Sequence, residues 1–275
     1  MSTLLRSAKS ASDWTVYDLQ AYNIKVSLFP DPQIYYGSSF STVAILTGSN
    51  SNIDPNLLSG TLSTKGLSPE TRRLLQYLDL SSRANSDQES TVHDFAKEIL
   101  CALGYQDPEY LLRTRYAIPL SINGDPNRSA QIDVGLVHGP SSLIVMLVVQ
   151  VQATVDPDPQ VIASAIAAFQ YNNRIRSRLG KPELNSTKFP CIAMIGTRPI
   201  ICVVPVTEEL SEAVLAGQYP ASQTVVNKCV VVSNSGRLNE DMESPDFRQV
   251  AIRHFHAFRK FVWDHWRNAS GKDFQ

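Results

Sequence analysis

The chain has 275 residues, 43% of them hydrophobic, which is ordinary for a globular protein that buries its own core. Its 25 basic and 26 acidic residues give a net charge of −1. The chain therefore lacks the basic excess with which dedicated nucleic-acid-binding proteins displace counterions from phosphates, and such a role would need a local basic patch.

The spacing of the cysteines and histidines and the length of the apolar runs argue against metal-binding, disulfide-rich and membrane proteins. The four cysteines form no C-x-x-C pair, so we expect neither a zinc site nor a disulfide framework. His254 and His256 lie two residues apart in a predicted helix and project to different sides, which excludes a shared metal. The apolar run Leu143–Val149 is too short to cross a membrane, and the N-terminus lacks a signal peptide. These patterns predict a cytoplasmic or nuclear protein that is not secreted and has no membrane partner.

Residues 1–90 are predicted to form an N-terminal extension that packs on the core. Ser, Asn and Pro clusters at Ser49–Pro55 and Ser81–Ser90 interrupt any long periodic segment. The aromatic-rich stretch Trp14–Val26 is expected to dock against the core, and Pro69–Leu80 is predicted to be a short helix.

The next range, residues 91–207, is predicted to be an α/β core and opens with a helix. Thr91 and Asp94 have the spacing of a capping box. Apolar residues then recur at helical intervals as far as Leu103, and Gly104 is placed to end the helix.

Three strands are predicted after this helix. Thr114–Ile122 and Gln131–Val137 are separated by Asn123–Pro126, whose Asn-Gly and Asp-Pro pairs favour a chain reversal. Leu143–Gln152 is apolar almost throughout, which is typical of a central strand covered on both faces.

A second helix is expected from Asp156 to Arg178, with an acidic residue and a proline at its start and basic residues at its end. Pro190–Val206 predicts a further strand pair. Residues 208–275 are predicted to be a C-terminal helical region of the same domain, in which Phe247–Arg267 is amphipathic. Its apolar stripe consists of Phe247, Ala251, Phe255, Phe258, Val262 and Trp266.

Polar residues mark the second and third predicted strands. Asp133 lies in the second strand, and the third strand ends in Gln150 and Gln152. This order of elements, with an Asp and then a polar pair on successive strands, resembles the PD-(D/E)XK nuclease-like superfamily over about residues 91–206. The resemblance implies a restriction-endonuclease-like fold, with a mixed central sheet flanked by helices, the N-terminal extension and the C-terminal amphipathic helix.

The resemblance also implies a set of site residues. In that superfamily an Asp and a Glu hold a divalent metal ion, often with a Glu of the first helix, and a Lys polarises the attacking water. Carried over to this chain, Asp133 and Glu98 would be metal ligands, while Gln150 and Gln152 occupy the Glu and Lys positions. These four residues are the candidate catalytic set.

Three further segments resemble an uncharacterised group of basidiomycete proteins in the same superfamily, which implies a fungal protein with a degenerate motif. The segments are Trp14–Val26, Ala167–Asn173 and Gly196–Thr207. The third strand of that group often ends in Gln-Glu-Asp-Lys.

Two alignments of the motif follow from this ending. If Gln150 matches the Gln of the group, the Glu and Lys positions become Val151 and Ala153. Alternation along a strand favours the other frame, because Gln150 and Gln152 then leave on one face and Val151 points into the opposite layer. Neither frame restores the catalytic residues.

The chemistry of these residues argues against catalytic activity. Mg²⁺ or Mn²⁺, the only cofactors expected if the protein is active, prefer hard oxygen ligands. Asp133, helped by Glu98 and the amide oxygen of Gln150, would hold such an ion weakly. Gln152 cannot supply the positive charge of a Lys, and losing one preorganised electrostatic group typically costs about 3 kcal/mol.

The helix after the third strand carries candidate substrate-binding residues. The resemblance implies that Gln170, Asn173 and Arg174 position phosphate groups. A polar helix face explains Gln170 and Asn173 equally well, and the positive charge of Arg174 also complements the end of a helix.

Three functions therefore stay open. The first is a PD-(D/E)XK-like protein with a decayed site at Asp133, Gln150 and Gln152, acting as a non-catalytic binding or scaffold protein. The second is a weakly active Mg²⁺- or Mn²⁺-dependent DNA or RNA endonuclease. The third is a protein-interaction module that self-associates, as a homodimer, through the aromatic C-terminal helix.

Overall fold

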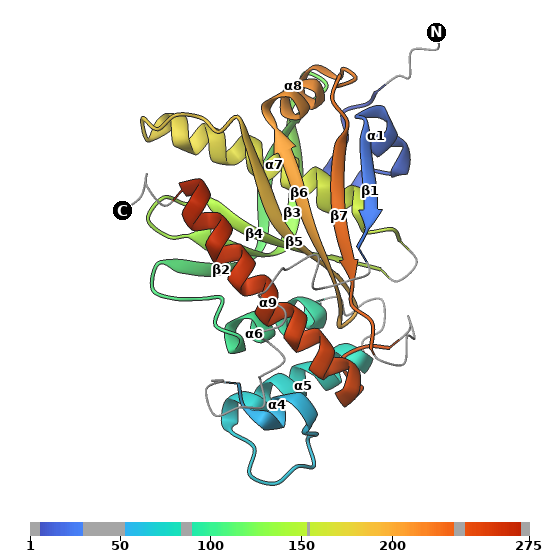
Figure 1. Cartoon of the computed structure of the whole chain (residues 1–275), viewed down its shortest axis with the longest axis vertical. Coiled ribbons are helices and arrows are strands. Elements are labelled where there is room, and N and C mark those ends of the chain that lie inside the picture. The colour runs from blue at the N-terminus through green and yellow to red at the C-terminus, as the bar shows by residue number, and fades with distance from the viewer. Residues whose placement is uncertain (1–5, 30–52, 84–89, 153–154, 234–239, 271–275) are drawn as a thin grey trace.

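The computed structural model describes residues 6–29, 53–83, 90–152, 155–233 and 240–270, which form a seven-stranded mixed sheet with helices on both faces (Figure 1). The strands are β1 (Ile24–Leu28), β2 (Tyr110–Ile122), β3 (Asp125–His138), β4 (Ile144–Val151), β5 (Ser186–Ile195), β6 (Arg198–Thr207) and β7 (Thr224–Val230). The helices are η1 (Ala11–Asp13), α1 (Val16–Ala21), α4 (Pro55–Ser59), α5 (Pro69–Arg83), α6 (Ser90–Ala102), α7 (Asp158–Arg178), α8 (Glu208–Ala216) and α9 (Pro245–Ser270). No helix within these described ranges is both long and apolar enough to cross a membrane.

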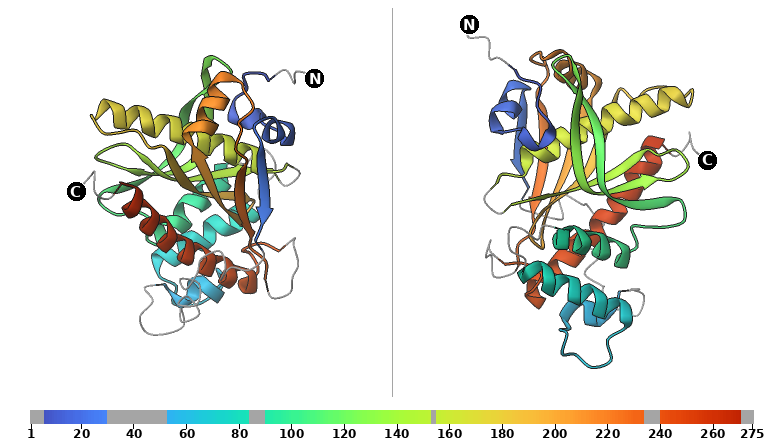
Figure 2. Two further views of the ribbon diagram at one scale, coloured as in Figure 1. Left: turned by 45° about the horizontal axis from the view of Figure 1, so that its top comes forward. Right: turned by 180° about the vertical axis from the view of Figure 1, so that it is seen from behind.

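The strand order across the sheet is β1-β7-β6-β5-β4-β3-β2. β4 runs parallel to β5, and β1 runs parallel to β7, while the other neighbours are antiparallel. Helix α7 lies on one face of the sheet, and α6 and α9 lie on the other (Figure 2). This confirms the predicted class, an α/β protein with a mixed sheet flanked by helices.

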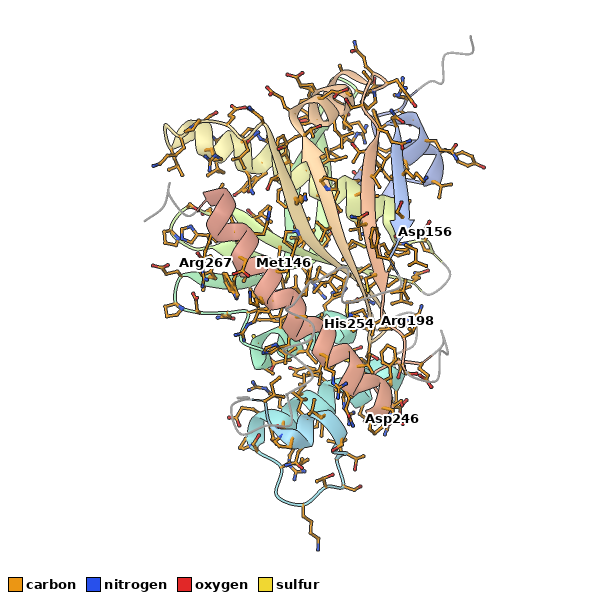
Figure 3. The ribbon with its side chains drawn as sticks, in the orientation of Figure 1. Met146, Asp156, Arg198, Asp246, His254 and Arg267 are labelled. Atoms are coloured by element: carbon orange, nitrogen blue, oxygen red, sulfur yellow. The ribbon has the colours of Figure 1, made fainter. Side chains whose placement is uncertain are left out.

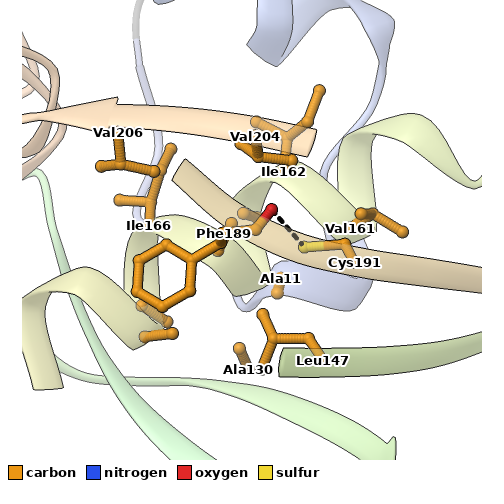
Figure 4. Close-up of a cluster of buried hydrophobic side chains, with 14 of the residues drawn as sticks. Ala11, Ala130, Leu147, Val161, Ile162, Ile166, Phe189, Cys191, Val204 and Val206 are labelled. Carbon is orange, nitrogen blue, oxygen red and sulfur yellow. Dashed lines mark hydrogen bonds between the residues drawn. The ribbon is translucent and has the colours of Figure 1, made fainter. Parts of the chain in front are cut away.

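Each face of the sheet has its own hydrophobic core. Leu147 and Val149 of β4 belong to the core beneath α7, where Phe189 of β5 also packs (Figure 4). Met146 and Val148 of β4 belong to the core beneath α6 and α9. β4 is therefore buried on both faces, as its continuous apolar sequence predicted.

The first predicted helix is present as α6. Its apolar positions, which are Val92, Phe95, Ala96, Ile99 and the following Leu103, are all buried. Gly104 follows the helix with φ +72°, a conformation that a glycine adopts without strain. The helix already begins at Ser90, so Thr91 lies inside it and the predicted capping box at Thr91 is wrong.

The β2–β3 hairpin was also predicted, but its strands are longer than expected. Asn123 and Gly124 both have positive φ, 51° and 75°, as a two-residue type I′ turn requires. β3 begins at Asp125, because ladder pairing continues through the exposed residues Pro126–Ser129, which carry no alternation signal. β2 begins at Tyr110, where Tyr110 pairs with His138 and the buried Leu112 pairs with Leu136.

Both ends of the chain contribute strands that were not predicted. β1, from the range expected to be only a packed extension, pairs with β7 from Ile24↔Thr224 to Leu28↔Lys228. The range 208–275, predicted to be helical, therefore also supplies β7. Docking of the aromatic segment is confirmed, since Trp14 and Tyr22 are buried and stack at 5.4 Å between ring centroids.

Helix α9 crosses the sheet over β4, near Met146 (Figure 3). The six residues of its predicted apolar stripe are each at most 9% exposed. The stripe is therefore part of the core of its own chain. This contradicts the expectation that the stripe is a surface for self-association.

His254 on α9 gives a testable pH dependence. Burial lowers the pKa of His254 to about 4, so its imidazole is neutral in the folded protein. In the unfolded chain its pKa is about 6.5, so the unfolded state binds more protons between these two values. We expect His254 to reduce the free energy of unfolding as the pH falls from about 6.5 towards 4, by on the order of 3 kcal/mol at most.

Urea unfolding between pH 7 and pH 4 measures this contribution when the wild type is compared with His254→Gln. The variant should show a flatter dependence of the unfolding free energy on pH. Equal slopes for the two proteins would show that His254 does not titrate in this way.

Candidate functional site

Asp133 of β3 has both carboxylate oxygens engaged by protein donors. Its Oδ1 lies 2.9 Å from Nε2 of His93, a residue of the first turn of α6. Its Oδ2 accepts the backbone N–H of Gln150 at 2.5 Å. The side chains of Asp133 and His93 are only 13% and 16% exposed, so the contact between them is largely shielded from water.

The ends of the strands explain why these groups meet. The pairing of β3 with β4 stops at Val134↔Val148, so the N–H of Gln150, two residues further on, has no strand partner on that side. A buried backbone donor must find an acceptor, and the Asp133 carboxylate supplies it. Asp133 thus continues the ladder beyond the last residue pair.

The two glutamines have different surroundings. Gln150 is half-buried, and its side-chain Oε1 is buried with no hydrogen-bond partner among the described residues. Gln152 follows the last residue of β4 and is exposed. Val151 lies between them, is 6% exposed and packs in the core beneath α7. This geometry favours the Gln150/Gln152 frame, because the alternative would place the second ligand position inside that core.

Glu98 does not join Asp133. Its carboxylate forms an ion pair with the Arg73 guanidinium of α5 at 2.9 Å. Glu98 lies five residues after His93, which is about 140° further around a helix, so the two side chains face different neighbours. The prediction that Glu98 is a second metal ligand is therefore not supported by the structure.

The residues around Asp133 do not fit a Mg²⁺ or Mn²⁺ ion. In the described part of the chain, no group of three or more His, Cys, Asp or Glu residues could hold a metal. One carboxylate, one imidazole and the neutral amide of Gln150 offer little charge to a hard cation, which prefers carboxylate and water oxygens. Both carboxylate oxygens of Asp133 also accept from protein donors already, His93 and the N–H of Gln150.

Three amide side chains of α7 hold the backbone of other segments. Each one accepts from the N–H and donates to the C=O of a single residue, with distances between 2.8 and 3.0 Å. The pairs are Gln170 with Ser121, Asn172 with Ile144, and Asn173 with Leu184. Each side-chain amide thus forms the two backbone hydrogen bonds that a residue of a neighbouring strand would otherwise form. These bonds do not support the prediction that Gln170 and Asn173 bind substrate, because both amides are hydrogen-bonded to the backbone.

Arg174 is the third residue of the predicted substrate-binding set. One Nη donates to the carbonyl of Pro119 at 3.2 Å, and the side chain remains exposed. The cavity beside it, of about 290 Å³, is also lined by Glu183, Glu208 and Glu212, whose negative charges disfavour a phosphate. This cavity lies on the α7 side of the sheet, whereas Asp133 faces α6, so Arg174 does not share a site with Asp133.

His93 was not among the predicted site residues. The signal was present in the sequence, because His93 lies three and seven residues before the buried Ala96 and Leu100 and so shares their helix face. What the sequence did not show was that this face of α6 lies against the end of β3.

Comparison with models of protein families found no match, and comparison with curated proteins found none either.

The side-chain amides of α7 that hydrogen-bond both backbone groups of one residue, here called amide clamps, lead to a prediction about stability. Asn172 is 5% exposed and satisfies both backbone groups of Ile144 at the start of β4. Replacing it in Asn172→Ala leaves a buried N–H and a buried C=O unpaired, at about 1–3 kcal/mol each. We expect the free energy of unfolding to fall by about 2–4 kcal/mol, measured by urea denaturation.

Arg174→Ala is the matched control on the same helix. It removes one exposed hydrogen bond and should cost less than about 1 kcal/mol. An equal fall in the free energy of unfolding in the two variants would show that the two hydrogen bonds of Asn172 do not stabilise the fold more than one exposed hydrogen bond does.

Proposed function

We propose that this protein is a non-catalytic binding or scaffold protein with a PD-(D/E)XK nuclease-like fold, in which Asp133 has become a structural residue. The observation that carries this proposal is the double engagement of Asp133, by the imidazole of His93 and by the N–H of Gln150. A carboxylate held in this way completes the end of a sheet, and each of its oxygens already accepts from a protein donor with which a metal ion would have to compete.

The order of elements supports the proposed ancestry. α6–β2–β3–β4–α7–β5 is the helix, strand, strand, strand, helix, strand order on which the resemblance to the superfamily rests. Asp133 lies on the second of these strands, and Gln150 lies at the end of the third. The resemblance therefore extends to where the polar residues lie along the strands.

Loss of catalysis follows from the chemistry of the same positions. Gln152 stands where the superfamily carries a Lys, and a neutral amide cannot stabilise an attacking hydroxide by charge. A weakly active endonuclease is the second candidate. The buried and unpartnered Oε1 of Gln150 favours it, because this oxygen is a ready ligand.

A basic edge close to Asp133 favours nucleic acid as the binding partner. Arg113 and Arg115 are exposed on β2, an edge strand of the sheet. The pairs Thr114↔Val134 and Tyr116↔Ile132 flank Arg115 on one strand and Asp133 on the other. This edge provides the local patch that a chain of net charge −1 would need to contact phosphates.

The shape of this edge depends on Arg115. Residues three apart lie on opposite faces of a regular strand, yet the guanidinium of Arg113 lies 4.0 Å from the centroid of the Tyr116 ring. Arg115 has φ +50°, and this left-handed residue changes the direction of the strand between them. The result is an exposed guanidinium held over the half-buried ring of Tyr116, and the outer face of that guanidinium can stack on a base.

Incubation with plasmid, single-stranded DNA and RNA in Mg²⁺ and in Mn²⁺ tests the absence of catalysis. The wild type and Asp133→Ala should both leave these substrates intact, because the site offers neither a second carboxylate nor an ammonium group. Cleavage by the wild type that Asp133→Ala abolishes would instead establish the weakly active endonuclease.

The double variant Gln150→Glu with Gln152→Lys is the informative companion in this assay. It restores the superfamily pattern in the favoured frame. Metal-dependent cleavage by this variant, lost on adding Asp133→Ala, would support the ancestry and the frame together.

Fluorescence anisotropy with labelled single-stranded DNA or RNA tests the proposed partner. Arg113→Ala with Arg115→Ala should weaken binding and reduce the slope of log K against log salt concentration by roughly 1–2, because each phosphate contact contributes about 0.7–0.9. Lys25→Ala is the control, since Lys25 is exposed on β1, the strand at the opposite edge of the sheet. Unchanged binding by the double variant, or binding only to an acidic protein, would exclude nucleic acid as the ligand of this edge.

A further inference from the structure

Arg248 places a positive charge inside the protein at the first turn of α9. The residue is 3% exposed. Its Nε, Nη1 and Nη2 atoms donate to the carbonyl oxygens of Leu58, Met242 and Gly60 at 3.3, 3.1 and 2.5 Å. Within the described ranges, Arg248 has no carboxylate at ion-pair distance.

Such a charge is costly. Moving an ion out of water carries a penalty of several kcal/mol, which carbonyl dipoles offset only in part. Burial lowers the pKa of Arg248 from its ordinary value for this reason. A guanidinium has five N–H groups, and the three carbonyl contacts use three of them, so two donors remain for another acceptor.

A pocket of about 280 Å³ opens beside Arg248. The hydroxyl residues Thr61 and Ser63 lie on one side of it, and the buried apolar side chains of Leu75 and Leu78 from α5 line it as well. The N-terminus of α9, at the end marked by Asp246 in Figure 3, adds the positive end of a helix dipole. The pocket therefore combines a positive charge, two hydroxyl groups and an apolar wall.

The remaining charges around the pocket restrict the ligand. Asp79 and Arg83 line it and form an ion pair with each other at 2.6 Å, and Glu243 contributes a further negative charge. These carboxylates would repel a dianion such as phosphate more strongly than a single carboxylate. A planar carboxylate also matches the paired donors of a guanidinium.

We propose that this pocket binds a small monocarboxylate with an apolar tail, whose carboxylate pairs with Arg248 and whose tail packs on Leu75 and Leu78. This site is separate from the Asp133 region, and it stands whether or not the proposed function is correct. The ligand compensates the buried charge and fills the apolar part of the pocket at the same time.

Hexanoate is a suitable probe, with 1-hexanol and hexylammonium as isosteres that lack the negative charge. Each is added to the full-length protein at matched ionic strength, and binding is followed by calorimetric titration and by the melting temperature. We expect hexanoate at ten times its Kd to raise the melting temperature by roughly 3–5 °C. Hexylammonium should have no effect, and hexanol should have a smaller one than hexanoate.

Ser63→Phe tests the location of the site without touching Arg248. Ser63 is exposed and lines the pocket, so a phenyl group there should block hexanoate while leaving the fold intact, as checked by circular dichroism. Ser129→Phe, the same change at an exposed position on β3, should leave binding unchanged. Arg248→Met should also abolish binding, but Arg248 ties α4 to α9 as well, so Ser63→Phe is the decisive variant.

Three results would overturn the proposal. The first is no effect of hexanoate on the wild type at tens of millimolar. The second is hexanoate binding that persists in folded Ser63→Phe. The third is stabilisation by hexanol equal to that by hexanoate, which would show that Arg248 does not recognise the charge.

Discussion

The burial of β4 on both faces is the constraint on which the rest of the structure depends. Water does not reach the backbone of a strand in this position. Where a neighbouring strand ends, side chains must therefore form the hydrogen bonds to its free N–H and C=O groups. At its start the amide of Asn172 pairs with both backbone groups of Ile144, and near its end the carboxylate of Asp133 accepts the N–H of Gln150. One side chain from the helix and one from the neighbouring strand thus complete the central strand at its two ends.

This constraint connects the stability of the fold to its chemistry. In a metal-dependent site the carboxylate of the second strand must be free to face a cation. Here the same side chain is held by a backbone donor and by the imidazole of His93, so the position that could have served catalysis stabilises the sheet. Removing one partner of such a buried pair leaves the other unpaired and costs more than the pair itself contributes. A carboxylate at 133 is therefore explained without any catalytic role.

The charged groups of the chain fall into two kinds. Among the described residues, some buried charges, such as Asp158 with Lys228 at 2.6 Å, have a partner of opposite charge. Arg248 departs from this pattern, since three carbonyl groups rather than a carboxylate surround it. On the surface, Arg113 and Arg115 concentrate positive charge on one edge strand of a nearly neutral chain. Arg248 and the β2 edge, rather than the average charge, are the basis of our proposals about what the protein binds.

The sequence alone determined the elements whose signals are local: the apolar period of α6 and α9, the Asn123–Gly124 turn and the continuous apolar run of β4. Only the tertiary structure decided the pairing of β1 with β7 and the contact of His93 with Asp133. It also decided the environment of Arg248, whose carbonyl partner Leu58 is 190 residues away. The physical reason is that periodicity and turn chemistry act over a few residues, whereas the partner of a buried polar group depends on which distant segments the whole fold brings together.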